Sequence, residues 1–459
     1  CLLEGNVGGI GVYGVGSARN TIAGGRHVNQ FYLDAGADTW SVSGVTFATG
    51  GLEINGACGA TLSGNTFSSA IATLTKCTGV TLSGNTFSSA RIVLQNNARA
   101  NLISQNTLTI AGAHAIDVMG DSNTITGNTI TGGGASGYGI WIEQFAETAL
   151  VTNNRVTSAF QGGFVIAGPG AIVEGNTAIG SASNGGFRFM TLADSALVRN
   201  NAAVGNTGYG FSIERPGAVL IGNTAYGNSS HGIQLFQSYG GRYQQNSSDS
   251  NSGYGLYIFA SATPNTFDRN NLVPPTTRPD SALFYDSTVA IGLGRTWWGV
   301  TDSTRVYARI NGSGKTAVTY TPWRLGFADT TVNADTIAPA APDTVVVSET
   351  TYSTATIRWA APTINEDGSA IAGLAGYRVY RARTVDSPSW EYRGAVAAGT
   401  MTFTDSGLAA DTLHCYRVTS YDNHAPWLNE SYFSDSIATC TPTMPVYNGP
   451  TWYIAADTG

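Results

Sequence analysis

Short stretches in which apolar and polar side chains alternate recur along the first part of the chain. Three of them are GLEIN from Gly51, GIWIE from Gly139 and GFSIE from Gly210. Alternation with a period of two is typical of a strand that buries one face. When such stretches are aligned, two inward rows are apolar throughout: Leu52, Ala72, Ile92, Ile116, Ile140, Phe164, Phe187, Phe211, Ile233 and Leu256, then Ile54, Leu74, Leu94, Val118, Ile142, Ile166, Phe189, Ile213, Leu235 and Ile258. The pattern predicts stacked strands that share one core.

The decapeptide TLSGNTFSSA occupies residues 61–70 and returns unchanged at residues 81–90. An identical block that returns after 20 residues indicates a structural repeat. The Asn of its GNT triplet recurs at steps of 20 to 26 residues, at Asn65, Asn85, Asn106, Asn128, Asn154, Asn176, Asn201, Asn223, Asn246 and either Asn270 or Asn271. Asparagine tolerates left-handed backbone, and its amide can bond to the next coil, so we expect these residues to have a structural role at buried turns.

Frequent glycine and β-branched residues argue against helices in these repeats. Each coil can instead bury its inward side chains against the coils above and below, through parallel strands about 4.8 Å apart. The sequence therefore predicts an all-β fold, a right-handed single-stranded parallel β-helix of about twelve coils.

The coils that carry the GNT triplet resemble the pectate-lyase-like β-helix superfamily, in which carbohydrate-binding and sugar-hydrolase repeats are common. The resemblance extends from about Gly8 to Asn271. That superfamily includes lyases, hydrolases, epimerases, adhesins and bare scaffolds, so the resemblance implies the fold and leaves the activity open.

The periodicity stops after Asn271, and the chain changes character. A WWG motif, a short helix expected over Thr301–Ile310 and a closing YTPW resemble the C-terminal cap of bacterial multidomain β-helix proteins. This resemblance implies that Trp297, Trp298, Tyr320 and Trp323 cover the open end of the last coil. Residues 343–443 then alternate at the spacing of a β-sandwich. They resemble a fibronectin type III domain, with Trp359 as its core tryptophan.

We therefore predict five parts: β-helix coils at 1–272, their cap at 273–330, a linker at 331–342, the fibronectin type III domain at 343–443, and a tail at 444–459. The tail resembles the start of a further β-helix domain. Because the first residues already look like a coil in progress, we expect the chain to be part of a longer multidomain protein.

Composition narrows the function classes. Charged residues are 12% of the chain, glycines number 58, and the net charge is −7. Lys76 and Lys315 are the only lysines, which excludes the basic footprint of a nucleic-acid-binding protein. No apolar run approaches the ~18 residues of a membrane span. We expect a secreted protein, extracellular or on the cell surface.

The five cysteines also favour an oxidising compartment. The fibronectin resemblance places Cys415 facing outward, opposite Cys440 across the last hairpin, and we expect a disulfide between them. Cys58 and Cys77 lie on adjacent coils, where either a bridge or stacked free thiols would fit. Cys1 is either a lipid-modified mature terminus or the first residue of a fragment.

The outward positions of the alternating strands carry the candidate chemistry. They bring together Asp117, Trp141, Glu143, Arg188 and Glu214, with Tyr257 further along. Acids, an aromatic ring and an arginine on a long β face suit the binding of a polysaccharide, and Trp141, Asp117, Glu143, Arg188 and Tyr257 are the candidate ligand contacts. The alternative is that scattered acids only solvate an exposed sheet.

Two functions remain open. The first is a non-catalytic surface rod that binds extracellular glycans or assembles with copies of itself, without a cofactor. The second is a polysaccharide lyase or glycoside hydrolase, with Asp117, Glu143, Arg188 and Glu214 as catalytic candidates. Carboxyl groups on adjacent coils would approach to about 5–7 Å, a separation suited to glycoside cleavage. A lyase would also need calcium. Short, regular coils favour the first function.

Overall fold

The computed structural model describes residues 10–12, 20–27, 29–110, 112–132, 136–214, 217–259, 265–320, 323–324, 326–327, 337–371, 373–385, 390–423 and 429–445. Cys1, the first half of the linker and the tail from residue 446 lie outside these ranges. The chain divides into two compact units, Cys1–Thr301 with Arg305–Ala334, and Asp302–Thr304 with Asp335–Gly459.

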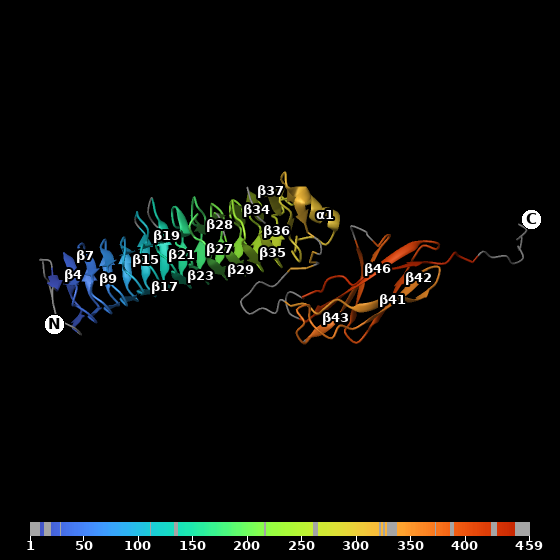
Figure 1. Ribbon diagram of the computed structural model, residues 1–459, viewed down its shortest axis with the longest axis horizontal. Coiled ribbons are helices and arrows are strands. Elements are labelled where there is room, and N and C mark those ends of the chain that lie inside the picture. The colour runs from blue at the N-terminus through green and yellow to red at the C-terminus, as the bar shows by residue number, and fades with distance from the viewer. Residues whose placement is uncertain are drawn as a thin grey trace, which may run out of the picture. The chain divides into compact units, whose positions relative to one another are not determined.

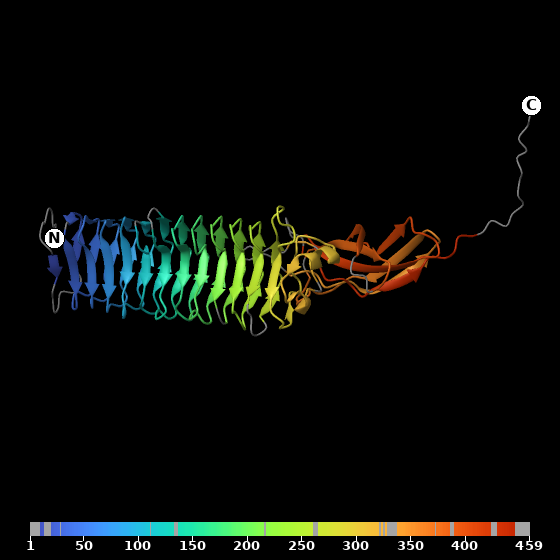
Figure 2. The ribbon, with the colours of Figure 1, turned by 90° about the horizontal axis from the view of Figure 1, so that it is seen from above.

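The N-terminal unit is a parallel solenoid whose three long sheets run along its axis (Figure 1). Twelve coils each contribute one strand to every sheet, and the first sheet has two further strands. Successive coils pair in parallel, as the view from above also shows (Figure 2). The fold is the predicted right-handed all-β parallel β-helix.

The first sheet has 14 strands. They are β1 (Ile10–Val12), β4 (Gln30–Asp34), β7 (Gly51–Asn55), β10 (Ile71–Thr75), β13 (Arg91–Leu94), β16 (Ile116–Val118), β19 (Tyr138–Ile142), β22 (Gly162–Ile166), β25 (Phe187–Phe189), β28 (Phe211–Glu214), β31 (Ile233–Phe236), β34 (Leu256–Phe259), β37 (Leu283–Asp286) and β39 (Ile310–Asn311).

The second sheet has 12 strands. They are β2 (Thr21–Ala23), β5 (Ser41–Ser43), β8 (Thr61–Ser63), β11 (Thr81–Ser83), β14 (Leu102–Ser104), β17 (Thr124–Thr126), β20 (Leu150–Thr152), β23 (Ile172–Glu174), β26 (Leu197–Arg199), β29 (Val219–Ile221), β32 (Arg242–Gln244) and β35 (Thr266–Asp268).

The third sheet also has 12 strands. They are β3 (Arg26–His27), β6 (Thr46–Phe47), β9 (Thr66–Ser68), β12 (Thr86–Ser88), β15 (Thr107–Ile110), β18 (Thr129–Gly132), β21 (Arg155–Thr157), β24 (Thr177–Ile179), β27 (Ala202–Val204), β30 (Thr224–Tyr226), β33 (Ser247–Asp249) and β36 (Asn271–Val273).

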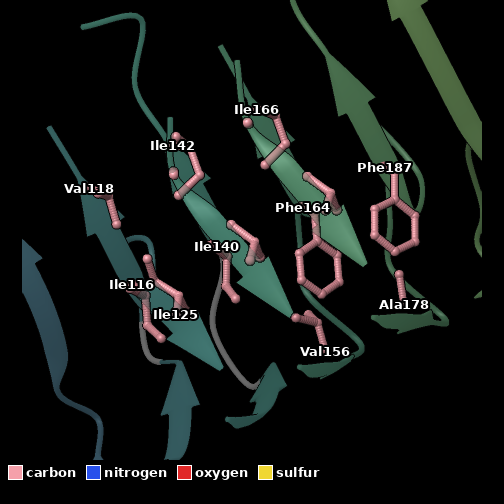
Figure 3. Packing of buried hydrophobic residues seen from close by; sticks show 14 of the residues in the cluster. Ile116, Val118, Ile125, Ile140, Ile142, Val156, Phe164, Ile166, Ala178 and Phe187 are labelled. Carbon is pink, nitrogen blue, oxygen red and sulfur yellow. The ribbon is translucent and has the colours of Figure 1, made fainter. Parts of the chain in front are cut away.

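The core is built from side chains that repeat in register from coil to coil. Ile116, Ile140 and Phe164 occupy one row of the first sheet, and the neighbouring sheets supply residues such as Ile125 and Val156 (Figure 3). Aromatic rings in equivalent positions stack along the axis. Phe67 and Phe87, from the two identical blocks, lie with ring centroids 4.4 Å apart.

The asparagines of the GNT triplets form a continuous chain of side-chain hydrogen bonds between the second and third sheets. Each amide donates to the amide oxygen of the next coil, as from Asn65 to Asn85 at 3.0 Å and from Asn246 to Asn270 at 3.1 Å. Asn270, rather than Asn271, therefore continues the row. The ladder consists of Asn65, Asn85, Asn106, Asn128, Asn154, Asn176, Asn201, Asn223, Asn246 and Asn270, all of them buried.

A second and shorter asparagine ladder lies five residues further along the chain in three coils. Asn206 donates to Asn228 at 2.9 Å, and Asn228 donates to Asn251 at 2.8 Å. A further pair, Asn101 and Asn123, is joined at 3.1 Å. These residues were not singled out by the GNT pattern, although each lies five residues after a ladder asparagine or, for Asn101 and Asn123, five residues before one.

The C-terminal end of the solenoid is closed by residues after β37. This region contains the helix α1 (Ser303–Ala308), which is shorter than the expected span, and the short helix η1 (Lys315–Ala317). Strand β38 (Ile291–Gly292) precedes α1 and pairs with strand β40 (Val318–Thr319), which follows η1. Trp298 is fully buried in the solenoid core, and Tyr320 and Trp323 pack against that core.

The second unit is an antiparallel β-sandwich. One sheet contains β41 (Asp343–Thr350), β42 (Thr354–Ala360) and β45 (Thr402–Ser406), and the other contains β43 (Leu374–Ala382), β44 (Glu391–Ala397), β46 (Leu413–Asp422) and β47 (Ile437–Cys440). Its core includes Trp359, Tyr377, Val379, Tyr416 and Val418.

The expected disulfide in this sandwich is wrong. Cys415 is opposite Ala438 in the β46–β47 pairing, whereas Cys440 is opposite Leu413, and both thiols are free. Cys415 is also buried, while Cys440 is exposed. The two side chains therefore occupy different environments. Cys58 and Cys77 are free thiols as well, which resolves the alternative left open for that pair.

Candidate functional site

Asp117 lies at the centre of the candidate residues on the outer face of the first sheet. Its in-register neighbours are Val93 on β13 and Trp141 on β19. The sequence predicted a solvent-facing carboxylate at this position, but the side chain is 5% exposed. The prediction failed because strand alternation gives the direction of a side chain, while large neighbouring side chains decide whether water reaches it.

Asp117 and Glu143 are carboxyl groups on adjacent coils. Burial above all, together with the nearby Glu143 carboxylate, raises the pKa of Asp117 to about 6, and Arg91 opposes this rise. The Oδ1 atom of Asp117 has no hydrogen-bond partner.

Trp141 packs beside two other aromatic rings. His114 and Tyr138 stack on each other across one coil, with an interplanar angle of 20°. Trp141 is inclined to these rings by 50° and 70°, at centroid distances of 4.5 and 4.9 Å. The indole of Trp141 is half-buried, and among the described residues no ring stacks face to face on it. His114, Asp117, Tyr138, Trp141 and Glu143 are called the Trp141 cluster below.

Arg188 and Glu214 extend this cluster by two coils. The guanidinium Nε donates to the Glu214 carboxylate at 2.7 Å, and the pair is partly exposed. Burial lowers the pKa of Arg188, but the ion pair with Glu214 and the Tyr138 side chain outweigh burial and raise it. Tyr138 also accepts a hydrogen bond at 2.9 Å from the Asn184 amide. The Tyr138 side chain therefore links the aromatic part of the site to the ion pair.

A pocket of about 230 Å³ opens beside the cluster, where the third sheet turns into the first. Arg91 and His114 line it, together with Ser69, Ser89 and backbone of Gly112. Burial and the nearby Arg91 charge lower the pKa of His114, which keeps its imidazole neutral. The pocket thus offers a neutral ring, hydroxyl groups and one cation next to Asp117.

The other predicted ligand contact, Tyr257, lies five coils away in a different arrangement. Its ring stacks on His231 at 4.3 Å and on Phe284 at 4.8 Å, with interplanar angles of 7° and 9°. Because these neighbours belong to the preceding and following coils, both faces of the Tyr257 ring are covered. Tyr257 is therefore not brought together with the Trp141 cluster, and its ring can offer a ligand only its edge and hydroxyl group.

Sequence reasoning missed Tyr138, Arg91 and Asn184. A usable signal was present, because an aromatic residue directly precedes the Gly or Ala that opens several strands of the first sheet. The residues at that position are His114, Tyr138, Tyr209, His231 and Tyr254. Their rings lie on the same outer face as the alternating residues, and they make the contacts described above.

The arrangement of charges decides between the chemistries that the site can perform. Glycoside hydrolases place their two carboxyl groups about 5–9.5 Å apart on either side of the bond that breaks. Of the two candidate carboxyl groups, that of Asp117 is buried, so a polysaccharide on the outer face of the sheet does not reach it. Arg188 is held as a cation by Glu214, which makes it a poor base for a lyase. The geometry favours binding.

Comparisons with known proteins match the solenoid in two overlapping ranges. The family described as "Right handed beta helix region" matches residues 29–178, and the family described as "Periplasmic copper-binding protein (NosD)" matches residues 144–278. Exoglucanase B of Cellulomonas fimi is 34% identical over 145 residues, which are 28% of this chain. The match spans 12% of the length of that relative.

The similar solved structures each match about a quarter of this chain. A fibronectin type III domain of a human protein is 13% identical and covers 26% of this chain and 100% of that chain, with a TM-score of 0.21. A β-1,2-glucanase from Parabacteroides distasonis is 19% identical and covers 25% of this chain and 14% of that chain, with a TM-score of 0.19. These scores are too low to establish a shared fold.

The residues of the solenoid do not fit a copper site. Within 144–278 the only histidine is His231 and the only methionine is Met190, and there is no cysteine. The Nδ1 atom of His231 already accepts a hydrogen bond from the Tyr254 backbone at 2.9 Å. In the part of the chain that the structure describes, no three His, Cys, Asp or Glu side chains are grouped to hold a metal ion.

One further finding concerns membranes: no described helix has the length and apolar character needed to cross one. The match to the right-handed β-helix model and the parallel solenoid topology agree on a right-handed β-helix fold for the N-terminal unit.

Proposed function

We propose that this protein is a non-catalytic, extracellular, glycan-binding rod. The observation that carries the proposal is the half-buried Trp141, whose indole has no ring stacked face to face on it. An aromatic face of this kind can pack on the apolar face of a sugar ring, while nearby polar groups bond to the hydroxyl groups. Glu143, the Tyr138 hydroxyl and the Arg188–Glu214 pair supply such groups around it.

The rigidity of the solenoid supports this function. The residues of the site stand on consecutive strands of one sheet and are held in register by backbone pairing. A ligand therefore meets a surface that is already arranged, and little conformational entropy is lost on binding. We further propose that the β-sandwich is a fibronectin type III domain that acts as a spacer, and that the protein acts outside the cell or at its surface.

Glycan binding is tested by affinity electrophoresis and calorimetry on the full chain with neutral and acidic polysaccharides. Trp141→Ala should weaken binding at least tenfold, because it removes the stacking surface. Tyr257→Ala is the matched control, since its ring faces are already occupied, and it should change the affinity by less than about threefold. Equal losses in both variants, or none in Trp141→Ala, would contradict the assignment of the site.

A glycoside hydrolase or polysaccharide lyase remains the second candidate function. It is favoured by one observation, the buried Asp117 carboxyl with a pKa of about 6 and an unpartnered Oδ1 atom. Such a group can hold a proton for transfer. The test measures new reducing ends and unsaturated products in the presence and absence of calcium. Cleavage that disappears in both Asp117→Asn and Glu143→Gln would establish this function in place of the first.

A further inference from the structure

The second sheet carries an aliphatic stripe on its outer face that the solenoid does not require. Four in-register positions on β20, β23, β26 and β29 are occupied by Leu150, Ile172, Leu197 and Val219. Ile172 is 37% exposed, and the other three are partly exposed. These four residues are called the aliphatic stripe.

The same row is mostly hydroxylated elsewhere. It holds Thr21, Ser41, Thr61, Thr81 and Thr124 in earlier coils, with Leu102 between the last two, and Arg242 and Thr266 in later coils. Threonine suits an outward strand position as well as valine or isoleucine does. The change to consecutive aliphatic residues is therefore not needed for strand formation. An exposed apolar patch of this kind marks an interaction surface.

The charged residues in the row beside the stripe indicate which kind of partner fits this surface. It holds Thr152, Glu174, Arg199 and Ile221 on the same four strands, and the Glu174 carboxylate accepts a hydrogen bond from Arg199 at 2.8 Å. One acid and one base thus lie on the two central strands, β23 and β26. A two-fold axis along the strand direction, midway between these strands, exchanges their positions.

We propose that the aliphatic stripe is the contact through which two copies of this chain pair face to face, with their solenoids antiparallel. The two-fold operation places Ile172 against Leu197 of the second copy and Leu150 against Val219 of the second copy. It places Glu174 against Arg199 of the second copy. At the ends of the contact Thr124 meets Arg242 of the second copy, so no like charges face each other.

The size of the contact sets its strength. Six coils extend about 29 Å along the axis and the strands are about 10 Å wide, which corresponds to roughly 600 Å² buried over both copies. Stable interfaces bury about 1,200–2,000 Å². The pair is therefore a weak, reversible dimer. It forms at high local concentration, which copies held side by side on one surface would reach. It is independent of glycan binding at Trp141.

Sedimentation equilibrium of the full chain without glycan tests this proposal. We expect a monomer–dimer equilibrium at concentrations up to about 0.5 mM. Ile172→Thr combined with Leu197→Thr should raise the dissociation constant at least tenfold, because threonine restores the character of the rest of the row. Ile71→Thr, at a 38% exposed aliphatic residue of the first sheet, is the control and should have no effect.

Charge exchange tests the geometry of the pair. Arg199→Glu alone should weaken the dimer at least tenfold, because two acids then face each other across the contact. Adding Glu174→Arg restores the opposite charges in both copies and should restore the dimer. A chain that stays monomeric throughout, assembly that continues beyond dimers, or a double exchange that stays monomeric would each overturn the proposal.

Discussion

Replacing Asn128 by alanine removes one amide from the middle of the asparagine ladder. The Oδ1 atom of Asn128 accepts hydrogen bonds from the Asn106 backbone and side chain at 3.0 and 2.9 Å. Its Nδ2 atom donates to the Ile103 carbonyl and to Asn154, both at 2.9 Å. All of these groups are buried, so water cannot replace the lost partner without opening the turn.

The expected loss follows from these four bonds. Each contributes about 1 kcal/mol net, so Asn128→Ala should lower the free energy of unfolding by about 4 kcal/mol. Thr129→Ala changes the exposed neighbour on the same turn and should cost less than about 1 kcal/mol. Asn128→Asp keeps an acceptor for Asn106 but sets a carboxylate against the Asn154 oxygen, so its loss should be smaller at low pH, where the group is protonated.

Urea denaturation measures the overall change, and hydrogen exchange resolved along the chain shows where it arises. Solenoid coils interact only with their neighbours, so faster exchange should be confined to the coils around Asn128. A loss below about 1 kcal/mol for Asn128→Ala would refute the reasoning, because the ladder would then contribute no more than a surface residue.

Three further predictions concern Asp117, the cap and the cysteines. Because the pKa of Asp117 is about 6 in the folded chain against 3.8 as its ordinary value, stability should fall as pH rises from about 4 through 6, and Asp117→Asn should abolish this fall in thermal melts. Trp298→Ala empties a fully buried position in the cap and should cost about 3–5 kcal/mol in urea denaturation. Reducing agents should leave the melting temperature unchanged, because Cys415 and Cys440 are free; a drop would reveal a bridge.

The solenoid could be predicted from the sequence because the alternation of apolar and polar residues is a local pattern that recurs in each coil. Leu52, Ala72 and Ile92 are in register in the structure as their pattern predicts, since each coil repeats the same choice between inward and outward. A wrong alignment of one coil can be recognised by comparison with the next coil. The asparagine turns were identifiable for the same reason.

The site was harder to predict because it depends on the burial and packing of individual side chains, which do not repeat from coil to coil. Alternation placed Asp117 on the outer face, but it could not show that this residue would be buried. It also placed Trp141 and Tyr257 in one row, although only Tyr257 has stacked rings on both of its faces. Cys415 and Cys440 show the same limit, because the strand pairing is shifted by two positions from the expected one, and alternation could not show that Cys415 is buried while Cys440 is exposed.

The asparagine ladder has a direction, and that direction bears on how such a rod can change in length. Each amide nitrogen in it donates to the Asn oxygen of the coil that follows and also to a backbone carbonyl of the coil before, so the bonds between the asparagines all run in one direction. Any coil with the same turn can therefore be inserted between two others, provided that the chain direction is kept. Gene segments that encode whole coils are thus interchangeable building units, and the unchanged decapeptide at residues 61–70 and 81–90 has the form that a tandem duplication leaves.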